Sequence, residues 1–190
     1  MCGGERHDSI LQRTCEYYDI AHRRWFAGVA NLTGGLYDRG RTGAVALSDG
    51  RYLYVLGGWQ GRRDALKEFL RYDPPSNAWT SLPSMQTPRA GAAGVFINNS
   101  LIICGGTRTA AGHVSSCEKF DIAANRWLPF PSLNKKRCYH SAFLYKGEVY
   151  MVGGNTQNNG LEKLNVSMLW QEIPTEVAGR HDMSAVLYYH

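Results

Sequence analysis

Short apolar runs separated by tight polar turns dominate the chain. Residues 43–47 and 52–56 form two such runs joined by Asp49-Gly50, and residues 66–72 and the segment around Trp79 follow after polar loops. A dipeptide such as Asp-Gly between apolar runs is a strong cue for a two-residue β-hairpin turn. High glycine, tyrosine and tryptophan contents also favour strands and turns over helix bundles. The pattern therefore predicts four short antiparallel strands.

The same four-strand pattern recurs along the chain with steps of about 50 residues. Glycine pairs mark it at Gly3-Gly4, Gly57-Gly58, Gly105-Gly106 and Gly153-Gly154. An aromatic–Asp dipeptide follows at Tyr18-Asp19, Tyr72-Asp73 and Phe120-Asp121, with Leu164-Asn165 as the degenerate fourth copy. A tryptophan comes next, at Trp25, Trp79, Trp127 and Trp170, and an arginine heads each following unit, at Arg41, Arg89, Arg137 and Arg180. Four markers that recur in the same order at similar steps indicate repeated blades of a β-propeller.

This ordered set of a glycine pair, a Tyr-Asp, a tryptophan and an arginine resembles the kelch repeat over nearly the whole chain. The resemblance implies an all-β, kelch-type β-propeller of four-stranded antiparallel blades, with the glycine pair ending the second strand and the tryptophan packing between blades. We expect a partial blade at 1–40, complete blades at 41–88, 89–136 and 137–179, and the first strand of a further blade at 180–190. An incomplete propeller or open arc, part of a larger propeller chain, is the expected arrangement. A four-bladed ring closed by residues 182–188 is the alternative.

Strand parity places the loops after the glycine pairs and the loops between blades on one face. These loops carry eleven basic and five acidic residues, a balance of +6, against +5 for the whole chain. We expect this face to attract a protein partner with an acidic or extended segment; a solvated rim without a partner is the alternative. The basic residues are not accompanied by a recognised nucleic-acid-binding motif, so we expect no nucleic-acid partner. The longest uncharged stretch is broken by Asn98-Asn99-Ser100, which argues against a membrane span.

The candidate partner-contacting residues lie on this face. They are Arg41, Trp59, Arg62, Arg63, Arg89, Arg108, Lys136, Arg137 and Arg180. In kelch adaptor proteins, which this chain resembles, arginines at the start of the innermost strands help line the substrate pocket. This implication applies only to the periodic arginines, Arg41, Arg89, Arg137 and Arg180. The alternative is that each guanidinium holds an interblade loop through backbone carbonyls. The binding hypothesis predicts that Arg89→Glu with Arg137→Glu abolishes partner binding and leaves the melting temperature little changed. Trp59 has no aromatic counterpart in the other units, so it is a candidate anchor.

The five cysteines include no Cys-x-x-Cys pair, which favours a reducing compartment and hence the cytoplasm. Cys2 with Cys15 and Cys104 with Cys117 occupy equivalent places on neighbouring strands, where another unit has Leu56 with Phe69. We therefore expect these thiols to fill the core, with a cross-strand disulfide as the alternative. Cys138 lies beside cationic residues and is a candidate reactive thiol.

Catalytic signatures are weak. The six histidines share no metal-ligand spacing, no phosphate-binding glycine loop is present, and we expect no metal and no cofactor. His140 with Tyr139 is the nearest approach to a polar set on an innermost strand. We expect a non-enzymatic protein-interaction module. The kelch resemblance implies substrate recognition for a cullin-type ubiquitin ligase, which needs a BTB or F-box domain absent from this sequence, or a cytoskeletal scaffold. The alternatives are a small-molecule enzyme, such as a sugar mutarotase or a copper oxidase, and a truncated fragment that does not fold alone.

Overall fold

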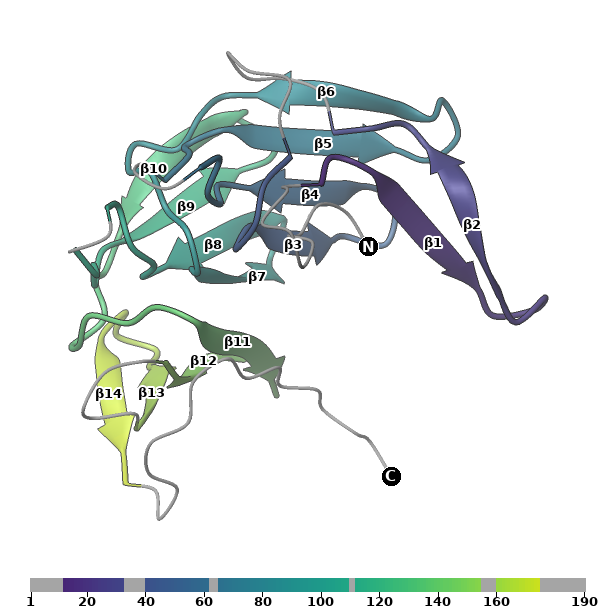
Figure 1. The fold of residues 1–190 in the computed structure, drawn as a ribbon. Helices are drawn as coiled ribbons and strands as arrows, with labels where there is room; N and C mark the ends of the chain where they lie inside the picture. Colours follow the sequence, from purple (N-terminus) through teal and green to yellow (C-terminus); the bar gives the residue numbers. More distant parts are fainter. Residues whose placement is uncertain (1–11, 33–39, 62–64, 110–111, 155–159, 175–190) are drawn as a thin grey trace.

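The computed structural model of this chain describes residues 12–32, 40–61, 65–109, 112–154 and 160–174. Regular structure in these residues is entirely β (Figure 1). The strands are β1 (Cys15–Asp19), β2 (Arg24–Val29), β3 (Val45–Ser48), β4 (Leu53–Leu56), β5 (Phe69–Asp73), β6 (Ala78–Leu82), β7 (Ala93–Ile97), β8 (Ser100–Cys104), β9 (Cys117–Asp121), β10 (Arg126–Phe130), β11 (His140–Tyr145), β12 (Glu148–Gly153), β13 (Leu161–Leu164) and β14 (Trp170–Ile173).

The strands form three antiparallel four-stranded sheets, β3–β6, β7–β10 and β11–β14, each paired in chain order. Strands β1 and β2 make a separate two-stranded sheet. Figure 1 shows the sheets following one another around an arc that does not close. This confirms the predicted all-β propeller of four-stranded blades. We refer to the β3–β6, β7–β10 and β11–β14 sheets as the second, third and fourth blades, and to β1–β2 as the first.

The tight turns set the strand register. Asn98 and Asn99 both have positive φ, 46° and 57°, as a type I′ turn requires. Ile97 then pairs with Ser100, and the pairing continues to Ala93 opposite Cys104. Because side chains alternate along a strand, this register decides which residues face the preceding blade and which face the next one.

The hydrophobic core lies between blades. Tyr54, Leu56 and Phe69 of the second blade face the third and are buried. Leu101, Ile103, Phe120 and Trp127 of the third blade pack against them. The same arrangement recurs one blade later, where Val149, Met151 and Trp170 pack on the third blade. Each blade therefore has one face that inserts into its predecessor and one face that receives its successor.

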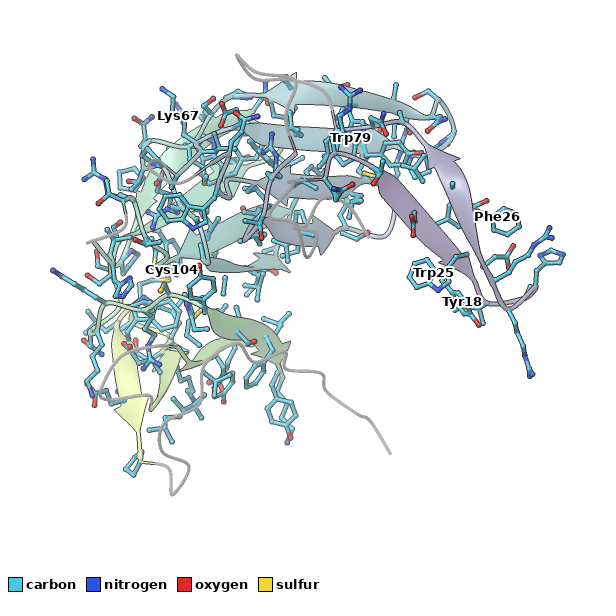
Figure 2. All side chains as sticks on the ribbon, viewed as in Figure 1. Tyr18, Trp25, Phe26, Lys67, Trp79 and Cys104 are labelled. Atoms are coloured by element: carbon cyan, nitrogen blue, oxygen red, sulfur yellow. A yellow bond between two sulfur atoms is a disulfide. The ribbon has the colours of Figure 1, made fainter. Side chains whose placement is uncertain are left out.

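The repeated tryptophans join neighbouring blades through a hydrogen bond as well as through packing. The indole N–H of Trp79 donates to the carbonyl of Ala30 at 2.8 Å, at the junction with the first blade (Figure 2). Trp127 donates to Pro83 at 2.7 Å, and Trp170 donates to Pro131 at 2.9 Å. In each case the acceptor is the residue directly after the last strand of the preceding blade.

Close backbone approach explains the glycine pairs. A Cβ atom on Gly57 would lie 2.1 Å from the carbonyl oxygen of Arg89, and one on Gly105 would lie 2.6 Å from that of Arg137. The second glycine of the pair donates its N–H to the same carbonyl, from Gly58 to Arg89 at 2.8 Å. A side chain at the first position would push the two blades apart.

The cysteines correct one expectation. Cys104 and Cys117 lie directly opposite each other on β8 and β9 and form a disulfide, so they are not two free core thiols. Cys2, of the other predicted pair, lies outside the described residues. Disulfides persist mainly in oxidising environments, so cysteine usage no longer supports a reducing compartment.

Candidate functional site

Three of the periodic arginines lie inside the molecule, at the start of each complete blade. Arg41, Arg89 and Arg137 are at most 3% exposed. In each, Nη1 donates to the carbonyl of the first glycine of a pair, 16 residues later: Gly57 at 3.1 Å, Gly105 at 2.7 Å and Gly153 at 2.7 Å. The arginine thus fixes the segment that enters a blade to the end of that blade's second strand.

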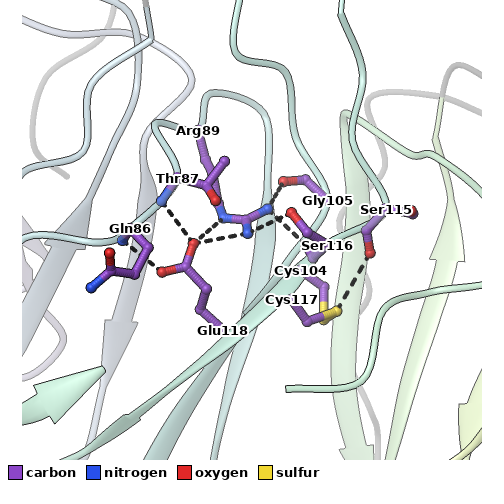
Figure 3. Close-up of polar contacts among 9 residues, drawn as sticks. All are labelled: Gln86, Thr87, Arg89, Cys104, Gly105, Ser115, Ser116, Cys117 and Glu118. Carbon is purple, nitrogen blue, oxygen red and sulfur yellow. Dashed lines mark hydrogen bonds and ion pairs between the residues drawn. A yellow bond between two sulfur atoms is a disulfide. The ribbon is translucent and has the colours of Figure 1, made fainter. Parts of the chain in front are cut away.

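Arg89 also belongs to a buried ion pair (Figure 3). Its Nη2 lies 2.9 Å from a carboxylate oxygen of Glu118 on β9. That carboxylate also accepts the backbone N–H groups of Gln86 and Thr87, at 2.7 and 3.0 Å. Burial lowers the pKa of the Arg89 guanidinium, and Glu118 offsets part of that effect. The pair therefore holds the loop between the second and third blades.

The fourth blade repeats this arrangement. Glu162 on β13 pairs with Arg137 at 2.9 Å and accepts the backbone N–H of Asn134 at 2.7 Å. Leu70 holds the matching place in the second blade. Sequence reasoning missed these carboxylates. The available signal was their fixed place two residues before Phe120 and Leu164, the repeat positions already identified.

The buried arginines require a correction. Arg41, Arg89 and Arg137 were expected to contact a partner, but their guanidinium groups are enclosed and engaged with backbone carbonyls. The contacts support the structural alternative, and we remove these three from the partner-contacting set. Arg62, Arg63 and Arg180 lie outside the described residues. Trp59, Arg108 and Lys136 remain from that set.

Trp59 and Arg108 come together in one loop cluster. Trp59 is half-buried and forms β-bridges with Thr42 and Ala65. Ala65 in turn donates its backbone N–H to the carbonyl of Arg108 at 3.1 Å, and the Arg108 residue is exposed. Residues of two successive blades therefore place an aromatic ring and a guanidinium on the same loop face.

A second aromatic residue, Tyr139, lies on the same face. It has a positive φ of 53° and is 37% exposed. Its ring rests on Gly91, where a Cβ atom would lie only 3.0 Å from the ring. Gly43 is the counterpart of Gly91 in the second blade, and there a Cβ atom would lie 3.5 Å from the ring of Trp59. The backbone N–H of Gly91 donates to the carbonyl of Gly43 at 2.8 Å, and that of Tyr139 donates to the carbonyl of Gly91 at 2.7 Å. These hydrogen bonds link the three blades on this face.

The comparison with protein families agrees with this architecture. The family model described as the KLHDC2/KLHL20/DRC7 Kelch-repeats domain matches residues 1–189. The chain belongs to the kelch-repeat family. No curated protein matches the chain. A kelch-repeat domain is in general a protein–protein interaction module, so the coarse functional expectation holds.

His140 differs from its counterparts in the other kelch blades, Ala44 and Ala92. It is buried, and neither ring nitrogen has a hydrogen-bond partner among the described residues. Burial, with the nearby charges of Arg137 and Arg89, lowers the pKa of His140 to about 3. The imidazole is therefore neutral near pH 7, and its enclosure keeps it from solvent-borne substrates.

Cys138 is also enclosed. Its thiol is fully buried and is not part of a disulfide, and its Sγ lies 3.9 Å from Nε2 of His113. Reaction with a soluble oxidant requires access to the sulfur, so this burial argues against the predicted reactive thiol.

Neither a metal centre nor a membrane span emerges from the described part of this kelch chain. Those residues include no group of three or more His, Cys, Asp or Glu able to hold a metal ion. They also include no helix long and apolar enough to cross a membrane. A pocket of about 380 Å³ opens on the opposite, tight-turn face, between Phe96, Asn98 and Leu144.

Proposed function

We propose that this chain is a non-enzymatic recognition module whose kelch loop face binds an extended, acidic segment of a protein partner. The observation that carries the proposal is the pairing of two aromatic side chains with exposed cations on that face. Trp59 and Tyr139 provide flat apolar surface. Arg108 is exposed, and its carbonyl accepts the N–H of Ala65 in the loop that follows Trp59, while Lys136 is exposed three residues before Tyr139. Aromatic residues and arginine are the types most enriched among residues that dominate binding energy.

Glycines let the two aromatic rings lie directly against the backbone of the blades. Gly43 and Gly91 carry no side chain at the inner ends of two successive blades, and the rings of Trp59 and Tyr139 lie against them. An extended segment laid across these positions would stack on the rings. Its carboxylates would then meet Arg108 and Lys136, where charge-assisted hydrogen bonds favour acidic side chains.

The wider role follows from the kelch resemblance. We propose an adaptor that either selects substrates for a cullin-type ubiquitin ligase or serves as a cytoskeletal scaffold. The first role requires a BTB or F-box domain, in a longer chain or in a partner subunit. Both roles use the same recognition step, an acidic peptide segment held on the loop face.

A displayed library of random peptides, selected against the folded chain, tests the recognition step. We expect the enriched peptides to carry net negative charge, and we expect Trp59→Ala to abolish their binding. Arg108→Glu should weaken binding by about 10-fold or more, as expected for a lost charge-assisted contact of at least about 1.4 kcal/mol.

Arg126→Glu is the matched control. It makes the same charge change on an exposed residue of the opposite face, at the turn between β9 and β10. Selected peptides without acidic bias, or equal losses in Arg108→Glu and Arg126→Glu, would refute recognition by the loop face.

A further inference from the structure

Trp25 is the exception among the four repeated tryptophans. Trp127 and Trp170 are buried and Trp79 is half-buried, each against the preceding blade, whereas Trp25 is 57% exposed. Its neighbour Tyr18 is 46% exposed, although the matching Tyr72 is buried at 9%. The first blade thus presents to solvent the face that the other blades insert into a predecessor.

This exposed face already has the geometry of an interblade contact. The rings of Tyr18 and Trp25 lie 5.4 Å apart, and those of Tyr72 and Trp79 lie 5.1 Å apart. The Phe120–Trp127 pair of the third blade has the same spacing of 5.1 Å. Figure 2 shows Tyr18 and Trp25 together near the far end of the β1–β2 hairpin. The aromatic pair therefore keeps this geometry although no described blade packs over it.

The opposite end of the arc presents the complementary face. Tyr150, Val152 and Leu161 of the fourth blade are only half-buried. Their counterparts in the second blade, Tyr54, Leu56 and Phe69, are the buried residues that receive the third blade. The counterparts in the third blade, Ile102, Cys104 and Cys117, are buried as well.

The matching hydrogen-bond acceptor is also present at that end. Ala30, Pro83 and Pro131 accept the indole N–H of the next blade's tryptophan, and each directly follows the last strand of its blade. Pro174 directly follows β14 and is exposed. One chain therefore carries both halves of one more interblade contact, at opposite ends.

We infer that this chain self-associates head to tail. Tyr18 and Trp25 of one copy pack on Tyr150, Val152 and Leu161 of a second copy, and the Trp25 indole donates to the carbonyl of Pro174. A second copy is the occupant because the contact continues an interface that the chain already forms between its own blades. Contacts of this head-to-tail kind generate closed rings when the rotation closes and open chains when it does not. The surface is separate from the loop face of the proposed function.

Sedimentation velocity over a concentration series tests the inference. We expect wild-type species of twice the monomer mass or more at high concentration. Trp25→Ala should weaken association about 30-fold or more, as expected when a central aromatic is lost from an interface. Tyr17→Ala is the matched control, because Tyr17 is 50% exposed and neighbours Tyr18, so it lies on the other face of the strand. Near-UV circular dichroism should show both variants folded.

A photocrosslink identifies the surface. A p-benzoylphenylalanine side chain at position 25 should form intermolecular crosslinks to the segment around Pro174 in mixed, isotope-labelled protein. A wild-type chain that stays monomeric throughout the series would overturn the inference and leave this face to another blade or to solvent. Equal losses in Trp25→Ala and Tyr17→Ala, or crosslinks to another surface, would also overturn it.

Discussion

Arg89→Met tests whether the periodic arginines hold the blades together. The change removes five hydrogen bonds, from the guanidinium to Glu118, Gly105 and Ser116. It also leaves the Glu118 carboxylate, with a side-chain exposure of 7%, without its cation. Removing one partner of a buried ion pair costs about 3–5 kcal/mol. For a chain of this length, that loss corresponds to a fall in melting temperature of roughly 6–20 °C.

Glu118→Leu is the matched variant, because the chain itself has Leu70 at this place in the second blade. Arg89 then retains its bonds to the carbonyls of Gly105 and Ser116, but its buried cation loses its anion and the N–H groups of Gln86 and Thr87 lose their acceptor. We therefore expect a loss of similar size, about 3–5 kcal/mol. Urea unfolding followed by tryptophan fluorescence gives both free energies. A loss below about 1 kcal/mol in either variant would refute the interpretation that the Arg89–Glu118 pair holds the blades together.

Three further outcomes follow from the packing, the disulfide and His140. Trp127→Ala should lower the free energy of unfolding by about 3–5 kcal/mol in a denaturant titration, because it empties an interblade site; an unchanged midpoint would contradict that packing. Cys104→Ala with Cys117→Ala should cost at least about 3 kcal/mol in the same assay, because the bridge closes a 13-residue loop. The His140 pKa of about 3 lies below its unfolded value, so stability should fall as pH drops from 6.5 towards 3. His140→Ala should reduce this dependence of the unfolding free energy on pH, measured in denaturant titrations across the same range. An unchanged dependence would show that other groups cause it.

The repeat markers gave a correct prediction of the fold for a local reason. The asparagines at 98–99 tolerate the positive φ that a type I′ turn requires, and the continuous apolar run at 101–104 predicts a strand buried on both faces. The four-strand pattern is therefore encoded in short stretches of sequence. The indole of Trp127 needs a carbonyl acceptor when buried, and the preceding blade supplies it at Pro83.

The arginines show where sequence reasoning failed. A periodic arginine before an inner strand fits either a pocket or an internal clamp, and one sequence does not distinguish them. The decision came from Glu118 and Glu162, which lie 29 and 25 residues along the chain from their arginines and meet them only after the sheets form. The disulfide was undecided for a similar reason, because strand pairing alone sets the distance between Cys104 and Cys117.

The sequence by itself determined the repeat, the four-stranded blade and the tryptophan that joins each blade to the one before. These follow from turn chemistry and side-chain alternation, which act over a few residues. Only the tertiary structure decided which charges reach solvent, leaving Arg108 and Lys136 outside while burying Arg41, Arg89 and Arg137. Exposure depends on what neighbouring blades cover, and that covering exists only once distant segments have packed together.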